Sequence, residues 1–147
     1  MKRLIVGIMM TLAFVCEGRA QEGLHIAGLF DGRYKRSDNA IEVTIKGKEL
    51  KPYRLTYFRS LTIKESPADF ERMERLVKED AREAVDKETG HIGERLYYGF
   101  YCLPPRKGVM RYLFYRNSSL RKVEPCEATL IYMEGNVSLE ELKEMFK

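Results

Sequence analysis

The chain has few of the residues on which metal sites and many catalytic sites depend. Its 147 residues include two histidines, three cysteines and no tryptophan. Neither histidine, His25 or His91, lies in a recognisable motif, since the sequence holds no HExxH, CxxC, GxSxG, P-loop or GxGxxG pattern. We therefore expect no metal site and no cofactor, and we consider a non-catalytic role more probable than an enzymatic one.

A long apolar run occurs only at the N-terminus. Lys2 and Arg3 precede the 13 residues Leu4–Cys16, and the small residues of Gly18–Ala20 precede Gln21. This is the layout of a secretory signal peptide. The run is shorter than the roughly 20 residues that span a membrane. We expect residues 1–20 to be a signal peptide and the mature chain to have no transmembrane segment.

Export would take the mature chain to the periplasm or out of the cell after cleavage near Ala20. Acylation at Cys16, as in a lipoprotein, is the weaker alternative, because bulky Val15 stands where such signals carry a small residue. Cleavage removes three basic residues and one acidic residue, so the net charge falls from +4 to +2. A nearly balanced charge does not favour binding to nucleic acid.

The mature sequence contains no repeat, no low-complexity tract and no linker rich in proline, glycine or serine. Its length suits one hydrophobic core. We therefore expect residues 21–147 to form a single domain.

Alternating apolar residues predict five strands. Ile41, Val43 and Ile45 alternate with polar residues and predict a strand with one buried face, whose flanking Lys46 and Lys48 suit a sheet edge. The other four strands are predicted over 53–63, about 96–103, 109–116 and 128–134.

Two helices have clear start signals. Ser66, Pro67 and Asp69 mark the start of a long helix, whose apolar stripe predicts that it continues to a stop at Gly90. Its exposed face would carry a group of acids, Glu79, Asp80, Glu83, Asp86 and Glu88. A short closing helix is predicted from a capping box of Ser138 and Glu141, with Val137 and Leu142 as a hydrophobic staple. Residues 24–35 fit either a helix or a strand, and we favour a helix.

Sequential strands joined by short turns imply an α+β fold: a two-layer domain with a mainly antiparallel sheet of about five strands. A meander of the last three strands would separate Cys102 from Cys126 by about 9–10 Å laterally. We predict that both thiols are free, because a disulfide needs Cα atoms within about 7 Å.

The aromatic residues supply the candidate site. In YYGFYCL (97–103), Tyr97 and Tyr101 share one face, while Leu96 is predicted on the other with Tyr98, Phe100 and Cys102. The last three strands are apolar on both faces, and helices of a two-layer domain cover only one. Either the segment 103–108 and the N-terminal segment cover the second face, or a tyrosine-rich face is partly exposed and binds an envelope protein or a small ligand. The candidate binding residues are Tyr97, Tyr101, Tyr115 and Arg111.

Two other functions remain open. A small hydrolase or transferase could use Cys102 as a nucleophile, with a base in the His91 loop. The aromatic strand 97–103 also resembles that of an RRM domain, which would bind RNA, although export and the balanced charge make this remote.

Several short stretches resemble one family. These are YRLTYFRSL (53–61), LPP (103–105) and TLIYMEG (129–135) followed by residues 138–142. They resemble a family of small exported proteins from Bacteroidetes that is known only as a domain of unknown function. The resemblance covers most of residues 24–147. It implies an exported α+β domain with a C-terminal helix after the TLIY strand, and it assigns no catalytic or ligand residues.

Overall fold

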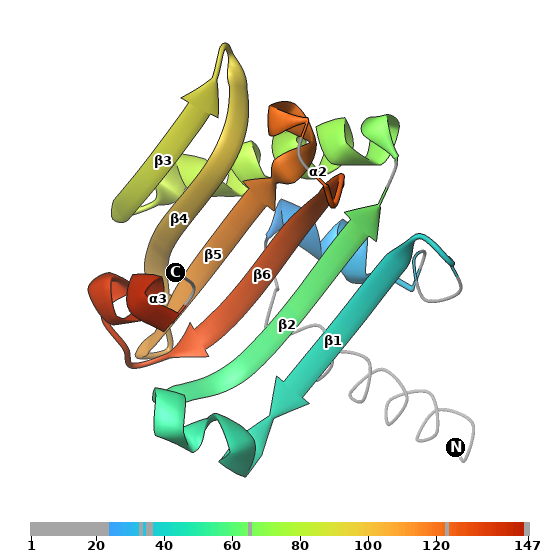
Figure 1. The fold of residues 1–147 in the computed structure, drawn as a ribbon. Coiled ribbons are helices and arrows are strands. Elements are labelled where there is room, and N and C mark those ends of the chain that lie inside the picture. Colours follow the sequence, from blue (N-terminus) through green and yellow to red (C-terminus); the bar gives the residue numbers. More distant parts are fainter. Residues whose placement is uncertain (1–23, 33, 35–36, 65, 123, 146–147) are drawn as a thin grey trace, which may run out of the picture.

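The computed structural model describes residues 24–145, except 33, 35–36, 65 and 123 (Figure 1). The predicted signal peptide over 1–20, including Cys16 and its possible acylation, lies outside the described residues. Within the described part of the chain, no helix has the length and apolar character needed to cross a membrane.

A six-stranded antiparallel sheet forms the centre of the fold, and its strand order is β1-β2-β6-β5-β4-β3 (Figure 1). The strands are β1 (Ala40–Lys46), β2 (Leu55–Lys64), β3 (Asp86–Ile92), β4 (Arg95–Arg106), β5 (Val109–Asn117) and β6 (Glu127–Gly135). The helices are α2 (Pro67–Asp80), α3 (Leu139–Met145) and the 3-10 helices η2 (His25–Phe30), η3 (Gly47–Tyr53), η4 (Ala81–Glu83) and η5 (Ser118–Arg121). The predicted α+β fold and antiparallel sheet are confirmed, with one strand more than expected.

The additional strand is β3, which the sequence predicted as the end of a long helix. Helix α2 ends at Asp80, and after η4 the chain pairs with β4 over Asp86–Ile92. The sequence DKETGHI carries little apolar alternation, so pairing along β4 decides its conformation. Gly90 lies opposite Tyr98, and a Cβ there would lie 2.4 Å from the Tyr98 ring, so this glycine serves strand packing and does not end a helix.

Helices α2 and η2 cover one face of the sheet, which we name the helix face. Apolar side chains of α2, including Phe70, Met73 and Val77, are buried there with Ile26 and Leu29 of η2. The predicted helix within 24–35 is thus a 3-10 helix over His25–Phe30.

The start of η2 is held by a carboxylate of α2. Asp80 accepts hydrogen bonds from the backbone N–H groups of His25 (2.7 Å) and Ile26 (2.9 Å). At the other end of η2, Arg59 of β2 donates to the Phe30 carbonyl (3.0 Å) and lies 4.5 Å from the Phe30 ring. These contacts explain why a charged residue interrupts the apolar face of β2.

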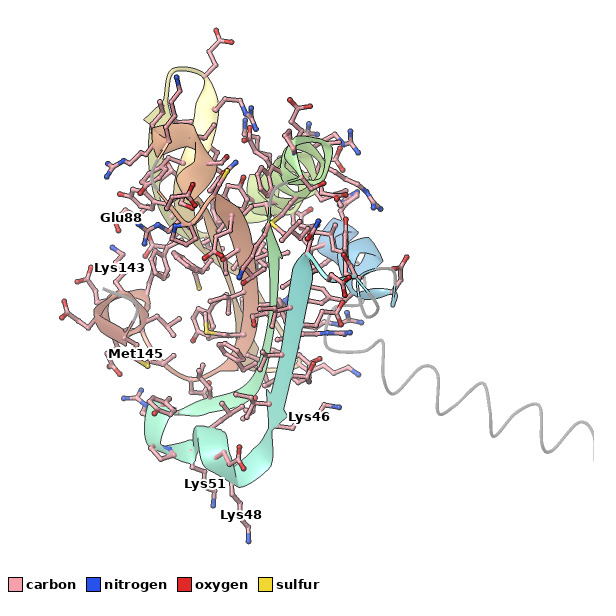
Figure 2. All side chains as sticks on the ribbon, turned by 45° about the vertical axis from the view of Figure 1, so that its right-hand side comes forward. Lys46, Lys48, Lys51, Glu88, Lys143 and Met145 are labelled. Atoms are coloured by element: carbon pink, nitrogen blue, oxygen red, sulfur yellow. The ribbon has the colours of Figure 1, made fainter. Side chains whose placement is uncertain are left out.

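Among the described residues, α3 and η3 cover the second face of the sheet, and they cover it at one end only. Figure 2 shows α3 on the side of the sheet opposite α2 and η2. Leu142 of α3 and Leu50 of η3 pack there against Tyr112 and Met133. The expectation that residues 103–108 and the N-terminal segment cover this face is wrong, because β4 continues to Arg106 and η2 lies on the helix face.

The closing helix begins as predicted. The Glu141 N–H donates to the Ser138 hydroxyl (3.1 Å), and Val137 and Leu142 share one buried cluster. At α2, in contrast, the Ser66 hydroxyl donates to the Asp69 carboxylate and makes no cap to the backbone.

Strand β1 lies at the sheet edge as expected, but its apolar face is not buried. Ile41 is 54% exposed and Val43 is 40% exposed. Both point to the second face of the sheet, where α3 and η3 cover only the opposite end. The prediction of a buried face on β1 is therefore wrong, because the pattern of one strand cannot show whether a helix covers it.

Candidate functional site

The uncovered end of the second sheet face is the candidate binding surface, and we name it the open face. It is formed by side chains from neighbouring strands that share this face, including Ile41, Val43, Thr62, Thr129, Phe114 and Arg116. The hydroxyl oxygens of Thr62 and Thr129 lie 3.2 Å apart across β2 and β6. Threonine hydroxyls and arginine on this end make it more polar than the end beneath α3.

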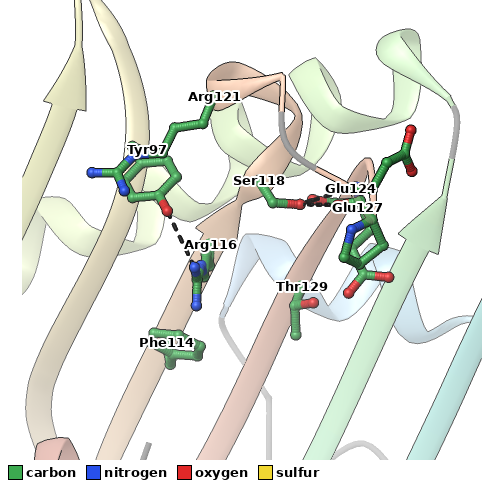
Figure 3. Close-up of a pocket in the computed structure, with 9 residues that line it drawn as sticks. Tyr97, Phe114, Arg116, Ser118, Arg121, Glu124, Glu127 and Thr129 are labelled. Carbon is green, nitrogen blue, oxygen red and sulfur yellow. Dashed lines mark hydrogen bonds between the residues drawn. The ribbon is translucent and has the colours of Figure 1, made fainter. Parts of the chain in front are cut away.

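One pocket opens on this face, and we name it the Tyr97 pocket (Figure 3). Its cavity volume is about 370 Å³. It is lined by Tyr97 of β4, residues of β5 and β6, and the segment between them: Phe114, Arg116, Ser118, Arg121, Glu124, Pro125, Glu127 and Thr129.

A bulge in β4 brings Tyr97 to this pocket. His91 pairs with Leu96 and Gly90 pairs with Tyr98, so Tyr97 has no partner residue in β3. A bulge of this kind reverses the alternation of side chains along the strand. Leu96 therefore packs in the helix-face core with Tyr101, and the predicted placement of Leu96 opposite Tyr101 is wrong.

Two arginines share the ring of Tyr97. The guanidinium carbon of Arg121 lies 4.4 Å from the ring centroid and that of Arg116 lies 5.7 Å from it. Arg116 also donates a hydrogen bond to the Tyr97 hydroxyl (3.2 Å). Both arginines are exposed. Cation–π contacts with the Tyr97 ring therefore keep two guanidinium groups at the mouth of the pocket.

Two acidic residues line the opposite side of the pocket. Figure 3 shows Glu124 and Glu127 across from Tyr97, Arg116 and Arg121. Among the described residues, no ion pair joins either glutamate to either arginine. The pocket therefore has a positive side and a negative side whose charges do not neutralise each other by direct contact.

The hydroxyl of Ser118 is used by the protein itself. It hydrogen-bonds to the carbonyls of Pro125 and Glu127, and it accepts from the Glu127 N–H (3.2 Å). These bonds fix the segment between β5 and β6. The Ser118 hydroxyl therefore has a structural role in the pocket wall. The groups that could bind a ligand are the arginines, the glutamates and the aromatic rings.

Comparison with known families shows to which family the chain belongs. A family model described as "Family of unknown function (DUF6108)" matches residues 13–146. The chain belongs to this family. No curated protein and no solved structure matches it. The family membership agrees with the resemblance found in the sequence, and the family's description names no activity.

The structure separates the four candidate residues that the sequence proposed for this DUF6108 protein. Tyr97 lines the pocket on the open face. Tyr101 and Tyr115 are buried in the core beneath α2, where burial raises the pKa of Tyr101 to about 12 and also raises the pKa of Tyr115. Arg111 donates to the Pro104 carbonyl (3.2 Å). Only Tyr97 is therefore placed to meet a ligand in the pocket.

The sequence proposed only Tyr97 of the nine residues that line the pocket, and it missed Arg116 of β5. Four of the other missed residues lie further along the chain: Arg121, Glu124, Glu127 and Thr129. They come from η5, the following turn and the start of β6. The turn between two strands was visible in the sequence, but nothing in its pattern places it beside Tyr97. That proximity results from the β4–β5–β6 meander.

The structure does not assemble the thiol and imidazole proposed for an enzyme. Cys102 is buried in the second-face cluster opposite Asp86, whereas His91 lies opposite Leu96 near the other end of β3. Burial raises the pKa of the Cys102 thiol, which disfavours a thiolate. Cys102 and Cys126 form no disulfide in the described part of the chain.

The proposed acidic cluster is also divided between elements. Glu79 and Asp80 are at the end of α2, while Asp86 and Glu88 are in β3. Across the described ranges, no three histidine, cysteine, aspartate or glutamate side chains gather closely enough to hold a metal ion.

Proposed function

We propose that this protein is an exported, non-catalytic binding protein of the cell envelope, and that its Tyr97 pocket holds a peptide-type ligand with both an anionic and a cationic group. One observation carries the proposal: arginines and glutamates lie on opposite sides of one pocket without pairing. A ligand with two opposite charges would satisfy both sides at once.

The positive side suits a carboxylate. Arg116 and Arg121 present planar guanidinium groups, which bind carboxylates through paired hydrogen bonds. Tyr97 keeps the two groups close, because both guanidinium groups lie within 6 Å of its ring. The ligand's carboxylate would lie between the arginines at the mouth of the pocket.

The negative side suits an ammonium group, and the floor suits an uncharged body. When ionised, Glu124 and Glu127 accept hydrogen bonds and donate none, so an ammonium group would match both their charge and their hydrogen-bonding capacity. The rings of Tyr97 and Phe114 offer apolar contact between the charged sides. A short peptide with free termini combines these three properties.

The N-terminal sequence supports export. Lys2, Arg3 and the apolar residues Leu4–Cys16 favour a signal peptide cleaved after Ala20. Mass spectrometry of the protein isolated from the envelope or the medium tests this, since the proposal expects an N-terminus near Gln21. A full-length chain in the cytoplasm would contradict export, and an acylated Cys16 would show a lipoprotein instead.

Calorimetry with the tripeptide Ala-Phe-Ala tests the binding role. We expect the free peptide to bind better than its N-acetylated form and its C-amidated form, and the doubly blocked form to bind worst. The double substitution Arg116→Gln/Arg121→Gln should raise the dissociation constant of the free peptide by about tenfold or more. Arg75→Gln is the matched control, because Arg75 is an exposed arginine of α2 on the helix face.

The acidic side has its own test. In the Glu124→Gln/Glu127→Gln variant, the free peptide and its N-acetylated form should bind with the same affinity. Equal binding of the free and doubly blocked peptides, or no binding below about 10 mM, would contradict the proposal. A short single-stranded RNA that binds with strong salt dependence would instead favour the RRM-like alternative.

A further inference from the structure

The two edges of the sheet differ in how they are protected. Edge strand β3 carries Asp86, Lys87 and Glu88 and has an irregular register at Gly90–His91, all of which discourage pairing with another chain. Edge strand β1 pairs with β2 over all seven residues, Ala40–Lys46, without irregularity. Three of its apolar residues are β-branched, and two of these are exposed, Ile41 and Val43.

The hydrogen-bond pattern shows which groups of β1 point outward. Lys64 donates its N–H to the Asn39 carbonyl (2.7 Å), and the two residues lie opposite each other in the β1–β2 register. Because hydrogen-bonded and non-bonded pairs alternate in an antiparallel ladder, Ile41, Val43 and Ile45 bond toward β2. The N–H and C=O groups of Glu42, Thr44 and Lys46 therefore face outward, and so does the Ala40 carbonyl, whereas the Ala40 N–H donates to the Ser37 carbonyl (3.4 Å).

We propose that two copies of this protein pair through β1, antiparallel, with a two-fold axis at Val43. Each Val43 would then face Val43 of the second copy in a non-hydrogen-bonded pair. Glu42 would exchange backbone hydrogen bonds with Thr44 of the second copy, and the Ala40 carbonyl would accept from the N–H of its Lys46. This register satisfies the outward backbone groups of Glu42 and Thr44 and the N–H of Lys46.

The side chains of β1 are complementary to themselves in this register. Ile41 would lie opposite Ile45 of the second copy, and these residues with Val43 would form one apolar strip of six side chains. On the other face, neither Glu42 nor Lys46 meets a like charge, and like charges directly opposite are destabilising. A two-fold interface needs this kind of self-complementary surface.

A register centred one residue away fits less well. An axis at Glu42 would place two glutamates opposite each other. An axis at Thr44 would place Ile41 against Gly47, which has no side chain to pack. The axis at Val43 is therefore the register that the β1 sequence favours.

Pairing would join two open faces into one continuous surface of twelve strands, with a Tyr97 pocket on each copy. The proposal rests on β1 alone and does not require the Tyr97 pocket to bind a ligand.

Sedimentation equilibrium of the purified protein, in the N-terminal form that the cell leaves, tests the association. We expect a reversible dimer, and Val43→Lys should raise its dissociation constant by about tenfold or more, since it places two ammonium groups on the axis. Val85→Lys is the matched control, because Val85 is 63% exposed outside β1. A monomer at every concentration, or equal effects of the two substitutions, would overturn the proposal.

Crosslinking tests the register in a Cys126→Ser background. Val43→Cys should form a disulfide-linked dimer on mild oxidation, since paired residues on the axis lie within disulfide reach. Ile45→Cys should crosslink far more slowly, because the two copies of residue 45 would lie about 14 Å apart along the strands. Equal or faster crosslinking through Ile45→Cys would overturn the register.

Discussion

Tyr112 and Val137 are joined by two hydrogen bonds across the covered end of the second sheet face. The Tyr112 hydroxyl donates to the Val137 carbonyl and accepts from the Val137 N–H (3.1 Å). Val137 directly precedes the turn into α3, so this single side chain of β5 holds the closing helix in place. Both residues are buried.

The substitution Tyr112→Phe should therefore destabilise the fold. It keeps the ring but leaves a buried N–H and a buried C=O of Val137 without partners, which costs about 1–3 kcal/mol. Urea unfolding measures the difference in unfolding free energy. Tyr53→Phe is the matched control, because Tyr53 is exposed. Equal stabilities of the two variants would contradict this role of Tyr112.

The link between His25 and Asp80 should make stability depend on pH. The pKa of His25 is raised, chiefly by its side-chain hydrogen bond to Asp80 (2.9 Å) and further by the charges of Asp80 and Glu79. Because the folded pKa lies above the unfolded value, the stabilisation is complete below about pH 6.5 and is lost as pH rises through the folded pKa.

Urea unfolding between about pH 5.5 and pH 8.5 measures this contribution. The difference in unfolding free energy between the wild type and His25→Asn should shrink as pH rises. NMR titration should also show a lower pKa for His25 in Asp80→Asn. A difference that grows with pH would contradict the proposed sign.

Gly135 should tolerate no side chain. A Cβ there would lie 2.5 Å from the Arg54 carbonyl oxygen and 2.8 Å from the Leu55 Cα, where β6 meets the bulged start of β2. Gly135→Ala should cost about 1–3 kcal/mol, as overpacking does. At Gly28, the control, a Cβ would find its nearest neighbour at 3.9 Å. If Gly28→Ala is as destabilising, the close approach at Gly135 is not the cause.

The two thiols should react at different rates. Cys102 is buried and burial raises the pKa of its thiol, whereas Cys126 is partly exposed. Iodoacetamide at pH 8 should therefore alkylate Cys126 well before Cys102. Mass spectrometry of the unreduced protein checks the free state, and a loss of two hydrogens would reveal a disulfide and contradict it.

Local signals in the sequence were sufficient for much of the fold. Alternation predicted β2, β4, β5 and β6, and the capping box at Ser138 predicted α3. These signals involve residues within a few positions of one another. The polar strand β3 could not be predicted in this way, because its conformation depends on pairing with β4.

Much of the candidate site depends on contacts that are distant in the sequence. Tyr97 was proposed, but its partner Arg121 comes from η5, which follows the neighbouring strand β5. The bulge at Tyr97 also reverses the side-chain alternation, which cannot be read from an uninterrupted aromatic run. Whether a sheet face is covered depends on where α3 and η3 dock, and β1 alone carries no signal for this.

Amide chemical-shift mapping with free Ala-Phe-Ala is the most direct test of the Tyr97 pocket. We expect the largest shift changes at Tyr97, Arg116 and Thr129, with smaller changes on the helix face around α2. The Arg116→Gln/Arg121→Gln variant should lose these changes. Changes centred on α2, or none up to about 10 mM peptide, would contradict the proposal that this pocket is the binding site.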